Sequence, residues 1–164
     1  MSDIQTITKL RKMTGAGMVD CKKALDEAGD DMDKAVEILR KKGETKAAKK
    51  ADREAKEGVV AVSENDTTLS LVALACETDF VAKNEDFINS VKSYADKQLE
   101  MGDEESFKSF ADEDVKKELV VRIGENIQVF SAKVIDKTGK TVGSYVHSNK
   151  KVAAVVVLAG GEVE

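Results

Sequence analysis

The N-terminal part of the chain places its apolar residues three and four positions apart, the spacing of short amphipathic helices. A capping-box pattern at Ser2 and Gln5 begins the first helix, and Gly29 stands where a second helix would end. Asp31 is suited to begin a third helix, which Gly43 would close. The apolar positions at this spacing are Ile4, Ile7, Leu10, Met18, Cys21, Leu25, Ala28, Ala35, Val36 and Leu39. The pattern predicts three short helices, which form a small module over residues 1–43.

Residues 44–57 keep helical spacing but present a different face. The apolar positions in this segment are alanines, which favour a helix but supply little bulk for burial. Such a segment is typical of a semi-rigid connector between two modules. We therefore predict a basic helical linker over residues 44–57.

After Gly58 the apolar period changes from that of a helix to that of a strand. Val60 and Val62 alternate with smaller or polar residues, residues 65–67 have turn composition, and residues 69–76 return as a largely apolar segment. Two such runs joined by a short polar turn are typical of a β-hairpin. The pattern predicts a hairpin at the start of the second module.

Helical spacing returns twice after the hairpin. A long helix should begin at Asn84, with one apolar face made of Phe87, Ile88, Val91, Ala95 and Leu99. Residues 102–111 are rich in acidic side chains and are predicted to be a connection. A further helix should begin at Asp112 and end at Gly124.

The C-terminal part contains three strand signals. Residues 127–135 and 142–147 flank a turn around Gly139, and residues 151–159 are nearly all apolar. A strand that apolar is typical of a central strand covered on both faces. The whole pattern predicts an α+β fold, in which residues 58–164 form a core domain of antiparallel strands and packed helices.

The charge is distributed unevenly, and this limits which partners are plausible. The net charge is −5, yet the segment 40–56 holds eight basic and three acidic residues, so the remainder carries −10. Most of the surface should repel nucleic acid, because affinity for nucleic acid comes from neutralising phosphates. The basic segment leaves two interpretations, a contact with RNA or a solvated helical linker, and the linker is favoured.

Cysteine usage and hydropathy indicate the compartment. Cys21 and Cys76 stand far apart and outside any paired motif, which indicates a reducing compartment without a disulfide framework. The longest apolar run, 152–159, is far shorter than the ~20 residues of a membrane helix. The N-terminus lacks the basic and apolar regions of a signal peptide. We predict a cytoplasmic protein without a membrane partner.

The residues needed for catalysis or for holding a cofactor are scarce. His147 is the single histidine, so it has no histidine partner for a zinc site, and neither cysteine stands in a ligand pair. The segment 139–141, Gly-Lys-Thr, resembles the end of a phosphate-binding loop, but Val134 stands where that loop needs its first glycine. The sequence therefore predicts no enzyme, no cofactor and no metal.

The segment 76–84 places apolar residues where an exposed connection is expected. Phe80 and Val81 lie between the second strand and the long helix, with Asp79 beside them. One interpretation is that Phe80 folds under as a lid on the helix. The other is that Phe80 is presented as an anchor for a partner, since aromatic residues on rigid supports are common centres of binding hot spots. Spacing alone leaves both open.

Four segments resemble the signatures of bacterial translation elongation factor Ts, in the order in which that family has them. They are residues 10–25, Thr78–Asn84, Arg122–Ile127 and Gly143–His147. Together they extend over most of the chain, so the resemblance is specific. Members of the family usually continue beyond the strand near residue 159, so the resemblance also implies a C-terminally short core domain.

The resemblance implies a function for each module. The N-terminal three-helix module is expected to be similar to a ubiquitin-associated domain and to dock on the GTPase domain of elongation factor Tu. Arg11, Met18 and Val19 match positions that touch this partner. The expected activity is guanine nucleotide exchange, in which elongation factor Tu is bound in its GDP form and in its nucleotide-free form.

The resemblance assigns the release of GDP to the core domain. Asp79 and Phe80, flanked by Thr78 and Val81, match the segment that approaches the nucleotide site, where the phenylalanine wedges into an apolar groove between two GTPase helices. His147 matches a position at the same interface. The implied result is loss of the magnesium and phosphate contacts of GDP, which needs no acid, base or metal from this chain.

Two alternatives remain beside exchange activity. The first is a ubiquitin-associated-type interaction module without effect on nucleotide, and the second is the RNA contact through the basic segment. The apolar strand at 151–159 also leaves two outcomes for self-association, a weak homodimer or a monomer with an exposed apolar patch around Val155 and Val157.

Overall fold

The computed structural model describes residues 3–159 and divides into two compact units. Unit 1 contains residues 3–53 together with Glu113–Asn126, and unit 2 contains Glu54–Asp112 together with the described residues that follow Asn126. The class is α+β, with antiparallel strands, as predicted. Within the described residues, no helix combines the length and the apolar character needed to cross a membrane.

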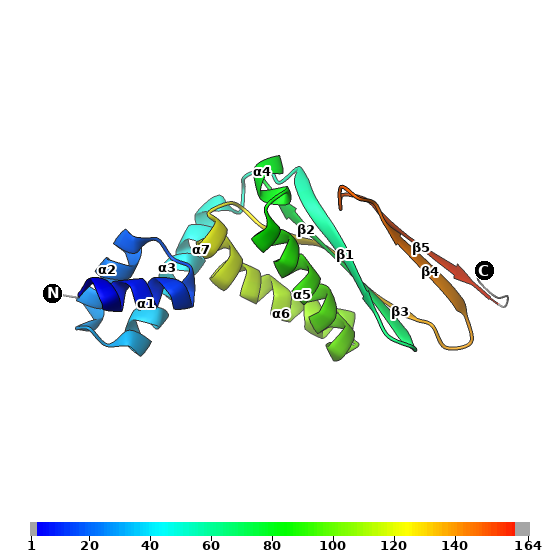
Figure 1. Cartoon of the computed structure of the whole chain (residues 1–164), viewed down its shortest axis with the longest axis horizontal. Helices are drawn as coiled ribbons and strands as arrows, with labels where there is room; N and C mark the ends of the chain where they lie inside the picture. The colour runs from blue at the N-terminus through cyan, green and yellow to red at the C-terminus, as the bar shows by residue number, and fades with distance from the viewer. Residues whose placement is uncertain (1–2, 160–164) are drawn as a thin grey trace. The chain divides into compact units, whose positions relative to one another are not determined.

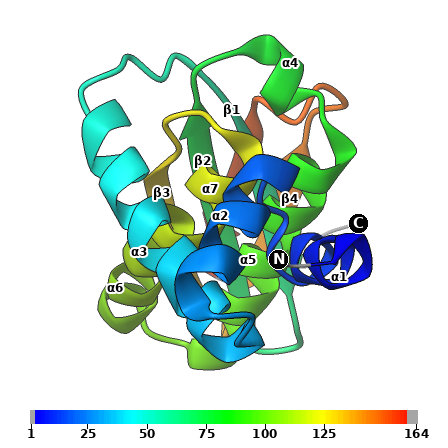
Figure 2. The ribbon, with the colours of Figure 1, turned by 90° about the vertical axis from the view of Figure 1, so that its left-hand side faces the viewer.

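Unit 1 begins with three helices: α1 (Ile4–Thr14), α2 (Met18–Ala28) and α3 (Met32–Lys50). Figure 2 shows α2 beside α3. Gly29 ends α2 with a left-handed φ of 64°, and the Asp31 carboxylate caps α3 by accepting the N–H groups of Asp33 and Lys34. Both predictions of helix ends are confirmed. Asp3 caps α1 by accepting the N–H of Thr6 at 2.6 Å, while Ser2 lies outside the described residues.

The core of unit 1 is small and made of aliphatic side chains from all three helices. Its buried members are Ile7, Leu10, Ala16, Cys21, Ala24, Leu25, Ala35 and Leu39, with Val121 packed against them. Two apolar positions of the predicted helical pattern do not belong to this core, because Ile4 and Met18 are exposed at 75% and 39%. The apolar stripe of the sequence therefore extends beyond the face that the helices bury.

Gly43 does not close the third helix, which is a correction to the sequence prediction. Helix α3 continues through it to Lys50, and Gly43 is buried against the π-helix η1 (Val115–Leu119) and α7 (Val120–Ile123). A Cβ at position 43 would overlap Val121 Cγ2 and would stand 3.4 Å from the carbonyl oxygen of Lys117. This glycine allows two helices to approach closely, and its helical backbone needs no left-handed conformation.

Unit 2 is built on a three-stranded antiparallel sheet in the order β1 (Glu57–Glu64), β2 (Thr68–Cys76), β3 (Gln128–Asp136). The predicted hairpin is confirmed, with Glu57 opposite Cys76 and Glu64 opposite Leu69. Helix α5 (Glu85–Met101) packs along one face of this sheet and begins at Asn84, as predicted (Figure 1). Phe87, Val91 and Ala95 on its apolar face are buried.

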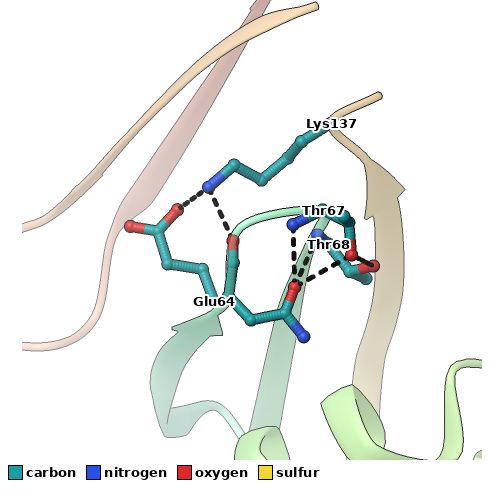
Figure 3. A network of polar contacts seen from close by, with 5 residues as sticks. Glu64, Thr67, Thr68 and Lys137 are labelled. Carbon is teal, nitrogen blue, oxygen red and sulfur yellow. Dashed lines mark hydrogen bonds and ion pairs between the residues drawn. The ribbon is translucent and has the colours of Figure 1, made fainter. Parts of the chain in front are cut away.

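A polar cluster closes the β1–β2 turn and ties it to the end of β3 (Figure 3). The Asn65 side-chain oxygen accepts the N–H groups of Thr67 and Thr68 at 3.0 and 2.8 Å. Lys137 donates to the Glu64 carboxylate at 3.0 Å and to the Asn65 carbonyl at 2.9 Å. The cluster therefore links the end of β1 and the turn that follows it to Lys137, the residue directly after β3.

The acidic segment after α5 is helical, which corrects the prediction of a connection over 102–111. Helix α6 (Glu104–Asp114) buries Phe107 and Ala111. Asp103 begins it by accepting the N–H of Ser106 at 2.7 Å. Glu104 accepts the N–H of Val134 in β3 at 2.7 Å, and this hydrogen bond lowers the pKa of the Glu104 carboxyl. The acidic residues thus cap and anchor a helix whose apolar positions are few.

The last two strands form a separate two-stranded sheet, β4 (Thr141–Val146) with β5 (Ala153–Leu158). Gly139 takes a left-handed φ of 67° in the turn before β4, as its predicted role requires. The prediction of a central strand at 151–159 is wrong, because β5 pairs with β4 alone among the described strands. Its side chains are open to solvent, with Val156 exposed at 56% and Leu158 at 47%.

Replacing Gly43 by alanine should destabilise unit 1. Alanine normally favours a helix over glycine by about 1 kcal/mol. Here the added methyl group overlaps Val121, and overpacking a filled site typically costs about 1–3 kcal/mol. We expect a lower urea midpoint for G43A. The matched control is G143A, because no atom lies within 4 Å of a Cβ at that position. A raised midpoint for G43A would show that the helices can separate without loss.

Candidate functional site

The segment between β2 and α5 forms one helical turn, α4 (Asp79–Ala82), which lies between two capping side chains, Thr78 at its own start and Asn84 at the start of α5. Thr78 precedes the turn, and its hydroxyl accepts the N–H of Val81 at 3.4 Å. Asn84 follows the turn, and its side-chain oxygen accepts the N–H of Asp86 at 2.8 Å at the start of α5. These caps satisfy backbone groups that helix ends leave unpaired. The segment is therefore held on both sides although it is short.

Phe80 points away from the protein. It is exposed at 82%, whereas Ala82 in the same turn is exposed at 4%. The interpretation of Phe80 as a lid on the long helix is therefore wrong, and the buried aromatic of this region is Phe87, with no exposed surface. Val81 is half-buried. The turn uses its small residue to attach itself to the core and presents its aromatic residue to solvent.

Asp79 is an ionised carboxylate held by lysines. Its Oδ2 lies 2.6 Å from Lys83 Nζ, one helical turn further along the chain. The hydrogen bond and the charge of Lys83 lower the pKa of the Asp79 carboxyl, and the charge of Lys151 lowers it further. Asp79 thus remains negative at all pH values near neutrality, beside an exposed aromatic ring.

His147 lies directly after β4, in the turn that leads to β5. Its side chain is exposed, and its Nδ1 lies 2.9 Å from the hydroxyl oxygen of Tyr145. The two ring centroids are 6.1 Å apart. The His147 backbone N–H donates to Val152 O at 2.9 Å, which closes the turn. The pair presents an aromatic and a hydrogen-bonding surface at the end of the hairpin.

The His147 turn and α4 attach to the same end of β1. Helix α4 packs on β1 and on β2. The carbonyl of Lys150 accepts the N–H of Val60 at 2.8 Å, and Lys151 forms an ion pair with Glu57 at the start of β1. Unit 2 therefore brings two predicted site segments, 78–81 and His147, to one end of one strand, although they are far apart in the sequence.

Arg11, Met18 and Val19 belong to unit 1. All three are exposed, Val19 at 67%. Arg11 lies in the last turn of α1, and the other two begin α2. They are available to a partner, and the core of unit 1 does not require them.

Most of the basic segment 40–56 is paired within the protein. The ion pairs are Arg40 with Glu118, Lys42 with Glu27, Lys46 with Asp20 and Lys56 with Glu54, and Lys50 donates to the carbonyl of Gly124. Nucleic-acid affinity depends on basic groups that are free to neutralise phosphates. These pairs disfavour the RNA contact, and together with the course of α3 they make residues 40–50 part of unit 1 instead of a solvated linker.

The described residues hold little that could perform chemistry. Between residues 3 and 159, no three side chains among His, Cys, Asp and Glu gather in a way that could hold a metal ion. Cys21 and Cys76 are buried and form no disulfide, and burial raises the pKa of the Cys21 thiol. The exposed features are an aromatic anchor, ionised groups and a histidine, which suit binding.

Two lysines of this site were missed by the sequence analysis. Lys83 stands four positions after Asp79, and this spacing on a helix is a recognisable signal for an ion pair. Lys151 pairs with Glu57, which lies on another strand and far away in the sequence. No local pattern indicates that second pair.

Comparisons with known proteins agree on one family. The family model described as elongation factor TS matches residues 77–164. The chain is 45% identical over 166 residues to elongation factor Ts of Deinococcus deserti, a match that covers 97% of this chain and 62% of that protein. It is 43% identical over 160 residues to elongation factor Ts of Christiangramia forsetii, covering 93% and 58%. It is 45% identical over 163 residues to elongation factor Ts of Teredinibacter turnerae, covering 96% and 56%. The chain thus spans 56–62% of the length of these three relatives.

Truncating Phe80 should leave the stability of the fold nearly unchanged. An exposed side chain that packs on nothing usually contributes less than about 0.5 kcal/mol, so F80A should keep the urea midpoint of the parent protein. F87A is the matched control, because loss of a fully buried phenylalanine costs about 3–5 kcal/mol. A large drop in the midpoint for F80A would mean that Phe80 packs in solution.

Proposed function

Because the chain belongs to the elongation factor Ts family, we propose that it binds elongation factor Tu and promotes the release of GDP during translation elongation. The observation that carries this proposal is the exposure of Phe80 on a turn that lies between two capping side chains. A rigidly held aromatic loses little conformational freedom on binding, and this favours it as an anchor. The proposed place of action is the cytoplasm, in keeping with two cysteines that form no disulfide.

In the proposed mechanism, the side chain of Phe80 acts as a wedge. Phe80 enters an apolar groove of the GTPase domain near the nucleotide site, with Asp79 beside it and Thr78 and Val81 holding the turn. His147 contacts the same domain. The magnesium and phosphate contacts of GDP are lost, and the nucleotide leaves. By linkage, a factor that lowers GDP affinity is itself bound more weakly by the GDP form, in the same ratio. The chain therefore acts through a ternary intermediate and is not an enzyme in the chemical sense.

Unit 1 has a different role in this proposal. Unit 1, which contains the ubiquitin-associated-like module predicted over residues 1–43, docks on the GTPase domain through Arg11, Met18 and Val19. Helix α3 carries unit 1 into the predicted linker 44–57, as far as Lys50, and residues 113–126 of the predicted core domain 58–164 also belong to unit 1. Docking by a separate surface raises the local concentration of Phe80 near its groove on the GTPase domain. This improves the affinity without changing the step in which GDP is released.

The alternative proposal is a ubiquitin-associated-type interaction module without exchange activity. The small three-helix core of unit 1 and its exposed Met18 and Val19 favour a binding surface there. The two proposals differ in the role of the capped turn in unit 2. Exchange requires Phe80, whereas the interaction module binds its partner without it.

Phe80→Ala should slow the release of GDP strongly. Truncating a central aromatic anchor typically costs about 2 kcal/mol or more, which is roughly a thirtyfold loss. The measurement mixes elongation factor Tu, loaded with a fluorescent GDP, with increasing amounts of each variant, and follows dye release. Lys97→Gln, on an exposed part of α5, is the control and should match the parent protein. Binding to elongation factor Tu with no release by the parent protein would favour the interaction module.

Changes in unit 1 should weaken the affinity for elongation factor Tu and leave the maximal rate of GDP release largely unchanged. The double variant M18A/V19A removes two exposed apolar side chains and should raise the concentration for half-maximal release by about tenfold, or ~1.4 kcal/mol. I4A removes an equally exposed apolar residue of unit 1 that matches no partner contact and should have no effect. Loss of the rate at saturation in M18A/V19A would contradict this division of labour.

Self-association is expected to involve β5. This strand has a main-chain partner on one side among the described strands, and Val156 and Val157 are exposed on it. An open apolar edge favours pairing with a second copy. Sedimentation at several concentrations should show a weak dimer, and V156K should shift the protein to the monomer. A parent protein that stays monomeric throughout and binds no dye for apolar surfaces would disprove this expectation.

A further inference from the structure

The His147 turn is attached to β1 by a backbone hydrogen bond and by the side chain of Lys151. Inside the turn, Lys150 N–H donates to His147 O at 2.8 Å, and Lys151 N–H donates to Asn149 Oδ1 at 3.0 Å. Toward the sheet, the turn makes the backbone hydrogen bond from Val60 to Lys150 O and the ion pair of Lys151 with Glu57. The ion pair is the side-chain part of this attachment.

The charge of Lys151 also acts on Asp79, the residue before Phe80. The Lys151 amine bonds Glu57 at the start of β1, and its charge acts on the Asp79 carboxylate in α4. Glu57 and then Asp79 raise the pKa of the Lys151 amine, so it stays positive at neutral pH. The charges around Asp79 are thus Lys83 from its own segment and Lys151 from the hairpin, with Glu57 behind Lys151.

This arrangement joins three segments that have no local connection. Glu57 belongs to β1, Asp79 to the capped turn, and Lys151 to the β4–β5 turn. Without the Lys151 amine, the His147 turn would lose its ion pair with Glu57 and would keep the backbone hydrogen bond from Val60 to the Lys150 carbonyl.

We propose that Lys151 is a positioning residue of the exchange site, which fixes the turn of His147 beside the segment of Asp79 and Phe80 through its ion pair with Glu57, at the start of the strand on which that segment packs. This inference deepens the proposed function and rests on it for the exchange readout. Lys151 itself need not touch elongation factor Tu. Its effect is on the geometry with which two contact segments are presented together.

The test compares K151Q with K150Q. Each variant removes one positive charge from the same turn, and K150Q keeps the carbonyl that bonds Val60. K151Q should lower the maximal rate of fluorescent GDP release by about two- to fivefold, the size expected for one partly exposed ion pair. K150Q should release GDP at the parent rate. K151R, which keeps the positive charge, should also release GDP at the parent rate, unlike K151Q. E57Q should reproduce the effect of K151Q, and the double variant should be no worse than either single variant.

A second readout needs no elongation factor Tu. In the free protein, NMR titration should show that K151Q raises the pKa of the Asp79 carboxyl and shifts the backbone amide signal of His147, while K150Q changes both far less. Equal effects of K151Q and K150Q in exchange and in NMR would overturn the proposal, as would a failure of K151R to restore the rate. If the parent protein promotes no GDP release, the proposed function fails. Effects of K151Q on the Asp79 pKa and on the His147 amide signal would still show that Lys151 holds the His147 turn in place.

Discussion

Thr78 and Asn84 cap two successive helices, and the surface of the site depends on this pair of side chains. A helix of four residues has almost no stability of its own, because the first turn fixes several residues for one hydrogen bond. Here the Thr78 hydroxyl accepts an N–H of the four-residue helix, and the Asn84 amide oxygen accepts an N–H at the start of α5, the helix that follows it. Caps of this kind are each worth about 1 kcal/mol. They make a short connection stiff enough to carry an exposed aromatic residue.

Exposure of an aromatic residue does not by itself indicate a contact site, and Phe130 shows why. Phe130 is exposed at 80%, nearly as much as Phe80 at 82%. Phe130 lies where the pairing of β2 with β3 shifts register, while Phe80 lies on the capped turn beside an ionised carboxylate. Burying a phenylalanine is worth about 1.5–3 kcal/mol. The folded chain forgoes this stabilisation at Phe80, and a partner that encloses the ring regains it.

Features encoded by neighbouring residues could be predicted from the sequence, and features that depend on distant contacts could not. Asp31 and Asn84 were identified as caps because a cap needs only the residues that follow it. Gly43 was misread because its meaning comes from Val121, which is remote in the sequence. Strand β5 was predicted to be central from its apolar content, but pairing decides which strand is central. For the same reason the Asp79–Lys83 pair follows a helical spacing, whereas the Lys151–Glu57 pair has no sequence signal.

The electrostatics of the site are arranged to stay constant around neutral pH. The pKa of Asp79 is lowered, so its favourable pairing is present above the ordinary carboxyl pKa and is lost only as the pH falls through the lowered value. The pKa of Lys151 is raised, so its pairing is present below the ordinary amine pKa and is lost only as the pH rises through the raised value. Between these limits both groups keep their charges. Under the proposed function, which needs shape and fixed charge and no proton transfer, such constancy is an advantage, because the surface offered to the partner does not vary with small changes of pH.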